Sequence, residues 1–163
     1  MYLNNKFPTY LQYLQGLRVL LVDSNDDFSH MMTVILQLYG VEVLTASLSQ
    51  QALEMFVLWE PDIIVSDIAM PHKDSYTLIQ KLITKAEKLG KMVIAIAVTD
   101  YGNKEMFQQD ICLGFNIKFT KPLDVDDFLT MLSSLVICQQ SSYVIAQQIL
   151  GIKPLLVLNS YNN

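Results

Sequence analysis

The stretch Pro61-Asp-Ile-Ile-Val-Ser-Asp67-Ile-Ala-Met-Pro71 decides the fold, because its short apolar run has a proline on each side. Residues 62–67 are too few for an ordinary helix and are rich in β-branched side chains, which predicts a strand. Three consecutive apolar residues at its centre indicate that both faces of the strand are buried. A strand of this kind is typical of a parallel sheet with helices on each side.

Similar apolar runs lie on both sides of this strand and alternate with longer segments of helical period. Gly40 and Gly90 are expected to end two of the helices, and Ser49 is expected to cap a third. The alternation predicts an α/β protein, a doubly wound (βα)5 three-layer sandwich with a flavodoxin-like parallel sheet in the strand order 2-1-3-4-5. The predicted strands are 18–23, 41–45, 62–67, 93–98 and 116–120, and the predicted helices are 27–39, one from 49, 76–89, 104–113 and 124–138.

Polar side chains lie at or directly after the ends of four of the predicted strands, namely Asp23, Asp67, Thr99 and Lys121. The carboxyl ends of parallel strands share one edge, where the ligand crevice of such a sheet lies, and strands 1 and 3 are neighbours at its switch point. Two nearby carboxylates repel each other, and Mg²⁺ is commonly held by one or two carboxylates together with waters and phosphate oxygens. An aspartate beside Mg²⁺ can accept a phosphoryl group, which a hydroxyl and an ammonium would stabilise.

At these residues the chain resembles the receiver domain of bacterial two-component response regulators. The resemblance covers about residues 16–138 and keeps the order and spacing of that family. The matching segments are Val-Leu-Leu-Val-Asp23, the stretch 61–71, Ile-Ala-Val-Thr99 and Phe-Thr-Lys121-Pro122.

The resemblance assigns a role to each residue of the predicted crevice. It implies that Asp67 is the phosphoacceptor, that Asp23 is an acidic residue of a Mg²⁺ pocket, that Thr99 is the switch hydroxyl and that Lys121 is the phosphate-binding amine. It further implies that the backbone carbonyl of Ala69 is a metal ligand. It also implies a cis peptide bond before Pro122, which only X-Pro bonds adopt at modest cost.

Four positions depart from the pattern of the family, and two of these, Ser75 and Asp100, replace small residues that are common at their turns. The other two affect the metal pocket and the switch. Ser24 stands where a second acid is usual, so the formal charge facing Mg²⁺ falls from about −3 to about −2 and metal affinity should weaken. Ser24 can still act as a metal ligand through a water. Lys118 replaces an aromatic residue that swings inward on activation, and a long charged side chain resists such burial.

The composition indicates where the protein is located and which classes of partner it binds. The net charge of −5 at pH 7 disfavours direct nucleic-acid binding, because the phosphate backbone attracts clustered Lys and Arg. The N-terminus lacks the basic start of a signal peptide, and no apolar run approaches the roughly 18 residues that span a bilayer. We therefore expect a cytoplasmic protein that contacts neither nucleic acid nor membrane, with Cys112 and Cys138 buried as thiols.

The length of 163 residues fits one domain. We expect a receiver domain at 17–140, an N-terminal extension at 1–16 and a C-terminal tail with an added helix at 141–163, which is too short for an output domain. The apolar pieces of this tail either pack on the sheet edge or contact a second copy or another protein. The sequence leaves both interpretations open, a possible homodimer included.

The implied function is that of a single-domain response regulator rather than an enzyme. A sensor histidine kinase or phosphotransfer protein would phosphorylate Asp67 in a Mg²⁺-dependent phosphorelay, and the receiver would then signal by contact with a downstream protein partner. The alternative, motivated by Ser24 and Lys118, is a phosphorylation-independent pseudo-receiver that acts as an interaction module. An aspartate-nucleophile phosphatase would need an acid in place of Ala69, and a flavin-binding domain would need phosphate-cradling donors at 24–27.

Overall fold

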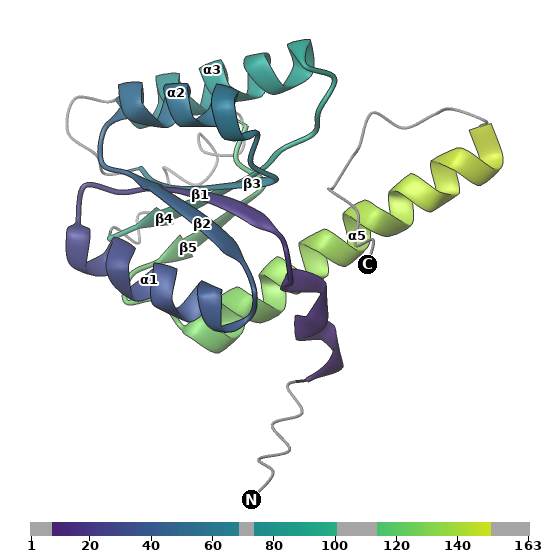
Figure 1. Cartoon of the computed structure of the whole chain (residues 1–163), viewed down its shortest axis with the longest axis horizontal. Helices are drawn as coiled ribbons and strands as arrows, with labels where there is room; N and C mark the ends of the chain where they lie inside the picture. Colours follow the sequence, from purple (N-terminus) through teal and green to yellow (C-terminus); the bar gives the residue numbers. More distant parts are fainter. Residues whose placement is uncertain (1–7, 69–73, 101–113, 151–163) are drawn as a thin grey trace, which may run out of the picture.

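The computed structural model describes residues 8–68, 74–100 and 114–150. Its five strands are parallel and form one sheet in the order β2-β1-β3-β4-β5, which confirms the predicted topology (Figure 1). The strands are β1 (Arg18–Val22), β2 (Glu42–Ala46), β3 (Ile63–Asp67), β4 (Ile94–Thr99) and β5 (Ile117–Thr120).

Helices cover both faces of the sheet, as a three-layer sandwich requires. α2 and α3 lie on one face, and α1 and α5 lie on the other (Figure 1). The helix predicted at 104–113 lies outside the described residues. The described helices are the 3₁₀ helix η1 (Thr9–Leu14), α1 (Asp26–Leu38), α2 (Ser49–Trp59), α3 (Asp74–Lys88) and α5 (Val125–Leu150).

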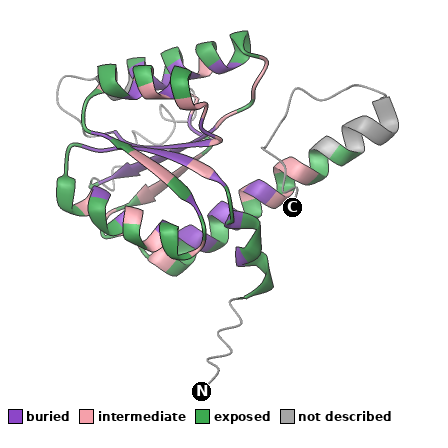
Figure 2. Ribbon diagram, in the orientation of Figure 1, coloured by how far each residue is buried: buried purple, intermediate pink, exposed green. Residues whose placement is uncertain are grey.

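The central strands are buried on both faces because their apolar residues are consecutive. In β1, Val19 and Leu21 join the core that packs under α1 and α5, whereas Leu20 and Val22 join the core under α2 and α3. Successive side chains of a strand point to opposite faces, so one short run supplies two cores. Figure 2 shows the buried residues along the strands and on the inward sides of the helices.

The start of α1 is fixed by a side-chain cap. Asn25 Oδ1 accepts a hydrogen bond from the backbone N–H of Phe28 at 3.0 Å, and two acids occupy the first turn, where they complement the helix dipole. The prediction that Ser49 caps α2 is wrong. Ser49 is already the first helical residue, and Leu48 at the cap position makes no side-chain hydrogen bond to the helix.

The segment before β1 contributes to the core. Leu11 and Leu14 of η1 are buried in the same cluster as residues of α1 and α5, and η1 packs directly against α5. Their spacing of three residues places both side chains on one side of a 3₁₀ turn. Residues 9–14 are therefore packed into the domain, while the boundary predicted at residue 17 stays a prediction.

α5 continues to Leu150, twelve residues beyond the predicted end at Cys138, and extends past the sheet (Figure 1). The expectation of a buried thiol is wrong for Cys138, which is exposed on α5, and Cys112 lies outside the described residues.

Among the helices that the structure describes, none is long and apolar enough to cross a membrane.

Replacing Leu14 tests whether the segment before β1 stabilises the domain. Leu14 is fully buried, so Leu14→Ala should lower the free energy of unfolding by about 2 to 5 kcal/mol. Urea unfolding measures the change, and Gln12→Ala on the exposed side of η1 is the matched control. Equal stability of the two variants would show that residues 9–14 are a dispensable extension.

Candidate functional site

The strand ends bring the four predicted site residues to one edge of the sheet. Asp67 and Thr99 are the last residues of β3 and β4, and Asp23 and Lys121 directly follow β1 and β5. The register keeps these ends level, since Val22 lies opposite Ser66, and Thr99 lies opposite Thr120. Three of the four are almost inaccessible to solvent, with Asp23 2%, Thr99 3% and Asp67 7% exposed.

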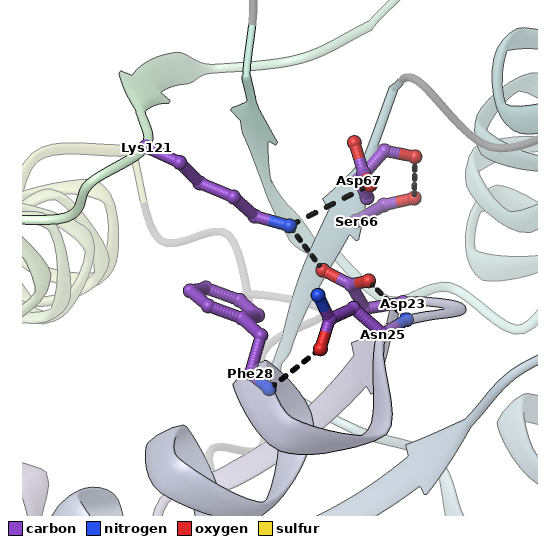
Figure 3. Close-up of polar contacts among 6 residues, drawn as sticks. All are labelled: Asp23, Asn25, Phe28, Ser66, Asp67 and Lys121. Atoms are coloured by element: carbon purple, nitrogen blue, oxygen red, sulfur yellow. Dashed lines mark hydrogen bonds and ion pairs between the residues drawn. The ribbon is translucent and has the colours of Figure 1, made fainter.

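The ammonium of Lys121 lies between the two acids. Lys121 Nζ donates a hydrogen bond to Asp23 Oδ2 at 2.8 Å and lies 3.6 Å from Asp67 Oδ2 (Figure 3). The backbone N–H of Lys121 donates to the carbonyl of Thr99 at 2.8 Å, which ties the loop after β5 to the end of β4. The Lys121-Pro122 bond is cis, as the resemblance implied.

The charges of the site keep Lys121 protonated. Partial burial alone would lower the pKa of Lys121, but the hydrogen bond and charge of Asp23, with the charges of Asp67 and Asp100, raise this pKa above its ordinary value. A basic group whose pKa is higher in the folded state stabilises the fold below its unfolded pKa. The stabilisation is therefore present at neutral pH and is lost only as the pH rises through the folded pKa of the lysine.

Backbone contacts fix the orientation of Asp23. Its Oδ1 accepts the N–H of Asn25 at 2.7 Å, while its Oδ2 accepts Lys121 Nζ, so both carboxylate oxygens have a donor. Its own N–H donates to the carbonyl of Ala46 at the end of β2. The acid is held at the sheet edge by three elements and has little freedom to turn away.

The donors present fit a Mg²⁺ ion. Two buried carboxylates already share one cation, and Mg²⁺ needs only one or two carboxylates when waters and phosphate oxygens complete its octahedron. Ser24 is exposed beside Asp23, and Ala69 lies outside the described residues. The described part of the chain holds no group of three or more His, Cys, Asp or Glu residues that could bind a metal without such additional ligands.

Two contributors to the site were missed by the sequence reasoning. Asn25 both caps α1 and orients Asp23, and an asparagine before a helical stretch is a recognisable cap signal. The ring centroid of Phe28 lies 4.2 Å from Lys121 Nζ. No sequence pattern could have indicated this contact, because it joins the first turn of α1 to the loop after β5.

The lysine at position 118 lies in β5, opposite Ala97 of β4, and is partly buried. Nearby, the rings of Phe119 and Phe128 pack edge to face, 5.2 Å apart, and join β5 to α5. Since successive side chains of a strand point to opposite faces, this aromatic pair lies on the α5 side of the sheet and Lys118 points to the other side.

The fold and site together define a doubly wound α/β domain with an acid and lysine cluster at its switch point. The model of the response regulator receiver domain matches residues 19–133. The chain therefore belongs to the receiver domain family of response regulators.

Individual relatives agree with this assignment. The chain is 32% identical over 114 residues to an uncharacterized 14.6 kDa protein of Leptolyngbya boryana, a match that covers 70% of this chain and 86% of the relative. It is 24% identical to the sporulation initiation phosphotransferase F of Bacillus subtilis, over 68% of this chain and 86% of that protein.

Solved structures share the fold. The chemotaxis protein CheY4 of Vibrio cholerae has a TM-score of 0.66 at 24% identity, over 72% of this chain and 97% of that one. A CheY-like receiver domain protein of Methanospirillum hungatei has a TM-score of 0.69 at 22% identity, over 77% of this chain and 98% of that one. Both comparisons cover nearly the whole of the solved structure and about three quarters of this chain.

The position of Lys121 predicts a competition between its ammonium and a metal ion. A unit charge a few ångströms away changes the interaction energy by about 1 to 4 kcal/mol in a partly solvated site. Lys121→Met should therefore bind Mg²⁺ about tenfold more tightly, measured by calorimetric titration. Lys88→Met, at an exposed lysine of α3, is the control and should leave the affinity unchanged. Weaker binding by Lys121→Met would contradict the competition.

Proposed function

We propose that the chain is a phosphorylation switch in which Asp67 accepts a phosphoryl group in a Mg²⁺-dependent phosphorelay. The observation that carries the proposal is the buried Asp67 carboxylate with Lys121 Nζ at 3.6 Å and the second acid, Asp23, on the same cation. A nucleophile, a counter-charge and an acidic pocket are the parts that phosphoryl transfer requires.

The chemistry would proceed at the carboxylate of Asp67. One of its oxygens attacks phosphorus, the bond from phosphorus to a histidine nitrogen of the donor protein breaks, and an aspartyl phosphate forms. Lys121 then donates to a phosphoryl oxygen in place of the Asp23 carboxylate, and the hydroxyl of Thr99 donates to another. Mg²⁺, when bound, supplies charge neutralisation for the phosphoryl oxygens.

The proposed metal ligands are the carboxylates of Asp23 and Asp67. The carbonyl of Ala69, as the family pattern implies, and a water held by Ser24 would complete the protein's share. Since Ser24 replaces an acid, the unphosphorylated pocket carries two carboxylates against one ammonium, and we expect it to bind Mg²⁺ weakly.

The proposed partners follow from this chemistry. The donor is a histidine kinase or a phosphotransfer protein, and one relative of the chain is itself a sporulation phosphotransferase. Signalling would occur by contact with a downstream protein, in the cytoplasm and without an enzymatic reaction on a separate substrate. A homodimer is a further proposed form of that contact, in which the extended part of α5 could take part.

The second candidate is a phosphorylation-independent pseudo-receiver. It is favoured by Ser24, which removes an acid from the pocket, and by Lys118, which is partly buried where an activation-linked aromatic would stand. Such a module would keep the fold and the Asp23–Lys121 pair but would bind its partner irrespective of phosphate.

A mass measurement separates the two candidates. Incubation with Mg²⁺ and acetyl phosphate should add about 80 Da, the mass of one phosphoryl group, to the intact chain. Asp67→Ala should show no adduct, and the adduct should require Mg²⁺. If the unaltered chain gains no mass and binds no Mg²⁺, the interaction module becomes the better account.

Restoring the missing acid tests the role of position 24. Ser24→Asp adds a third carboxylate to the pocket, so its affinity for Mg²⁺ should rise about tenfold, since ligand charge sets much of the affinity. Calorimetric titration measures the change, and Ser134→Asp on the exposed side of α5 adds the same charge far from the pocket. An equal effect of both variants would mean that residue 24 does not face the metal.

A further inference from the structure

The ammonium of Lys121 has an aromatic ring on one side and two carboxylates on the other. Its Nζ lies 4.2 Å from the ring centroid of Phe28, 2.8 Å from Asp23 Oδ2 and 3.6 Å from Asp67 Oδ2. Figure 3 shows the Phe28 ring, at the start of α1, facing the end of the lysine side chain. This cation–π contact belongs to none of the family roles assigned above.

The contact completes a ring of interactions that links Asp23, Asn25, Phe28 and Lys121. Asp23 Oδ1 accepts the N–H of Asn25, Asn25 Oδ1 accepts the N–H of Phe28, the Phe28 ring faces Lys121, and Lys121 donates to Asp23 Oδ2. The cap of α1 fixes the backbone of Phe28, and contact of its side chain with the core under α1 and α5 limits rotation of the ring. The ring is therefore held beside the ammonium.

The ammonium of Lys121 contacts the Phe28 ring on one side and the two carboxylates on the other. The side chain of Lys121 is only 12% exposed, so water covers little of it. An ammonium desolvated in this way interacts favourably with the face of a phenyl ring, by about 0.5 to 2 kcal/mol. Phe28 also packs against the core under α1 and α5, which keeps the ring in place.

We propose that Phe28 is a positioning residue, which holds the Lys121 ammonium over the Asp23 and Asp67 carboxylates and so sets how readily Mg²⁺ displaces it. The metal part rests on the proposed function, because it assumes that Mg²⁺ uses the same two carboxylates. With the ring present, the lysine stays in the pocket and competes with the metal. Without the ring, the lysine leaves more easily, and the metal binds more tightly.

The first test needs no variant and no metal. Protons above the face of an aromatic ring resonate upfield, so the ε-methylene protons of Lys121 in the unaltered chain should be shifted upfield relative to those of other lysines in an NMR spectrum. The shift should vanish in Phe28→Leu and persist in Phe28→Tyr. Unshifted Lys121 protons in the unaltered chain would overturn the proposal, whatever the outcome of phosphorylation experiments.

The second test measures Mg²⁺ affinity by calorimetric titration. Phe28→Leu should bind Mg²⁺ about two- to thirtyfold more tightly, the range that loss of an ammonium–ring contact implies, and Phe28→Tyr should match the unaltered chain. Ile35→Val, at a partly buried residue of the same helix and core, controls for loosened packing and should not tighten binding. Tightening by Ile35→Val, or weaker binding by Phe28→Leu, would refute the positioning role.

The two tests separate this proposal from the proposed function. If the Lys121 protons are shifted upfield by Phe28 but the unaltered chain binds no Mg²⁺, the positioning contact stands, whereas the metal-dependent function and the competition both fail. If Mg²⁺ binds but Phe28→Leu and Phe28→Tyr change the affinity equally, the proposed function stands and the positioning role fails.

Discussion

The site depends on one shared cation. Asp23 and Asp67 are both buried at adjacent strand ends, and two carboxylates so placed would repel each other strongly without a positive charge between them. Lys121, 98 residues after Asp23 in the sequence, supplies that charge. The strand order brings these three side chains together, because β1 and β3 are neighbours and β5 forms an edge of the same sheet. The hydrogen bond from the backbone N–H of Lys121 to the carbonyl of Thr99 keeps the loop after β5 in position.

Much of this arrangement could be predicted from the sequence because few topologies suit it. Short apolar runs buried on both faces indicate a parallel sheet, and the carboxyl ends of its strands share one edge, so the sequence predicts Asp23, Asp67, Thr99 and Lys121 at that edge. The structure has all four there, at the ends of β1, β3, β4 and β5. The packing of Leu14 and the exposure of Cys138 could not be predicted, since both depend on where α5 lies relative to η1. The contact of Phe28 with Lys121 likewise depends on side-chain directions between distant elements.

In the proposed function, two features of the site would favour the lysine over the metal. Ser24 stands where the family usually has an acid, and Phe28 provides a favourable contact for the Lys121 ammonium, so both would shift the balance toward Lys121. Phosphorylation would reverse this balance, because the phosphoryl oxygens offer both the metal and the ammonium new partners. On this account the lysine, and not an aromatic residue at position 118, is the group whose partners change.

The most direct measurement is a crystal structure of the chain with Mg²⁺ and beryllofluoride, a mimic of the phosphoryl group. The account predicts the mimic on the carboxylate of Asp67, Mg²⁺ between Asp23 and Asp67, and Lys121 Nζ hydrogen-bonded to a fluorine instead of to Asp23. A structure at saturating concentrations of both reagents in which Lys121 still bridges the two acids and neither reagent is bound would contradict it.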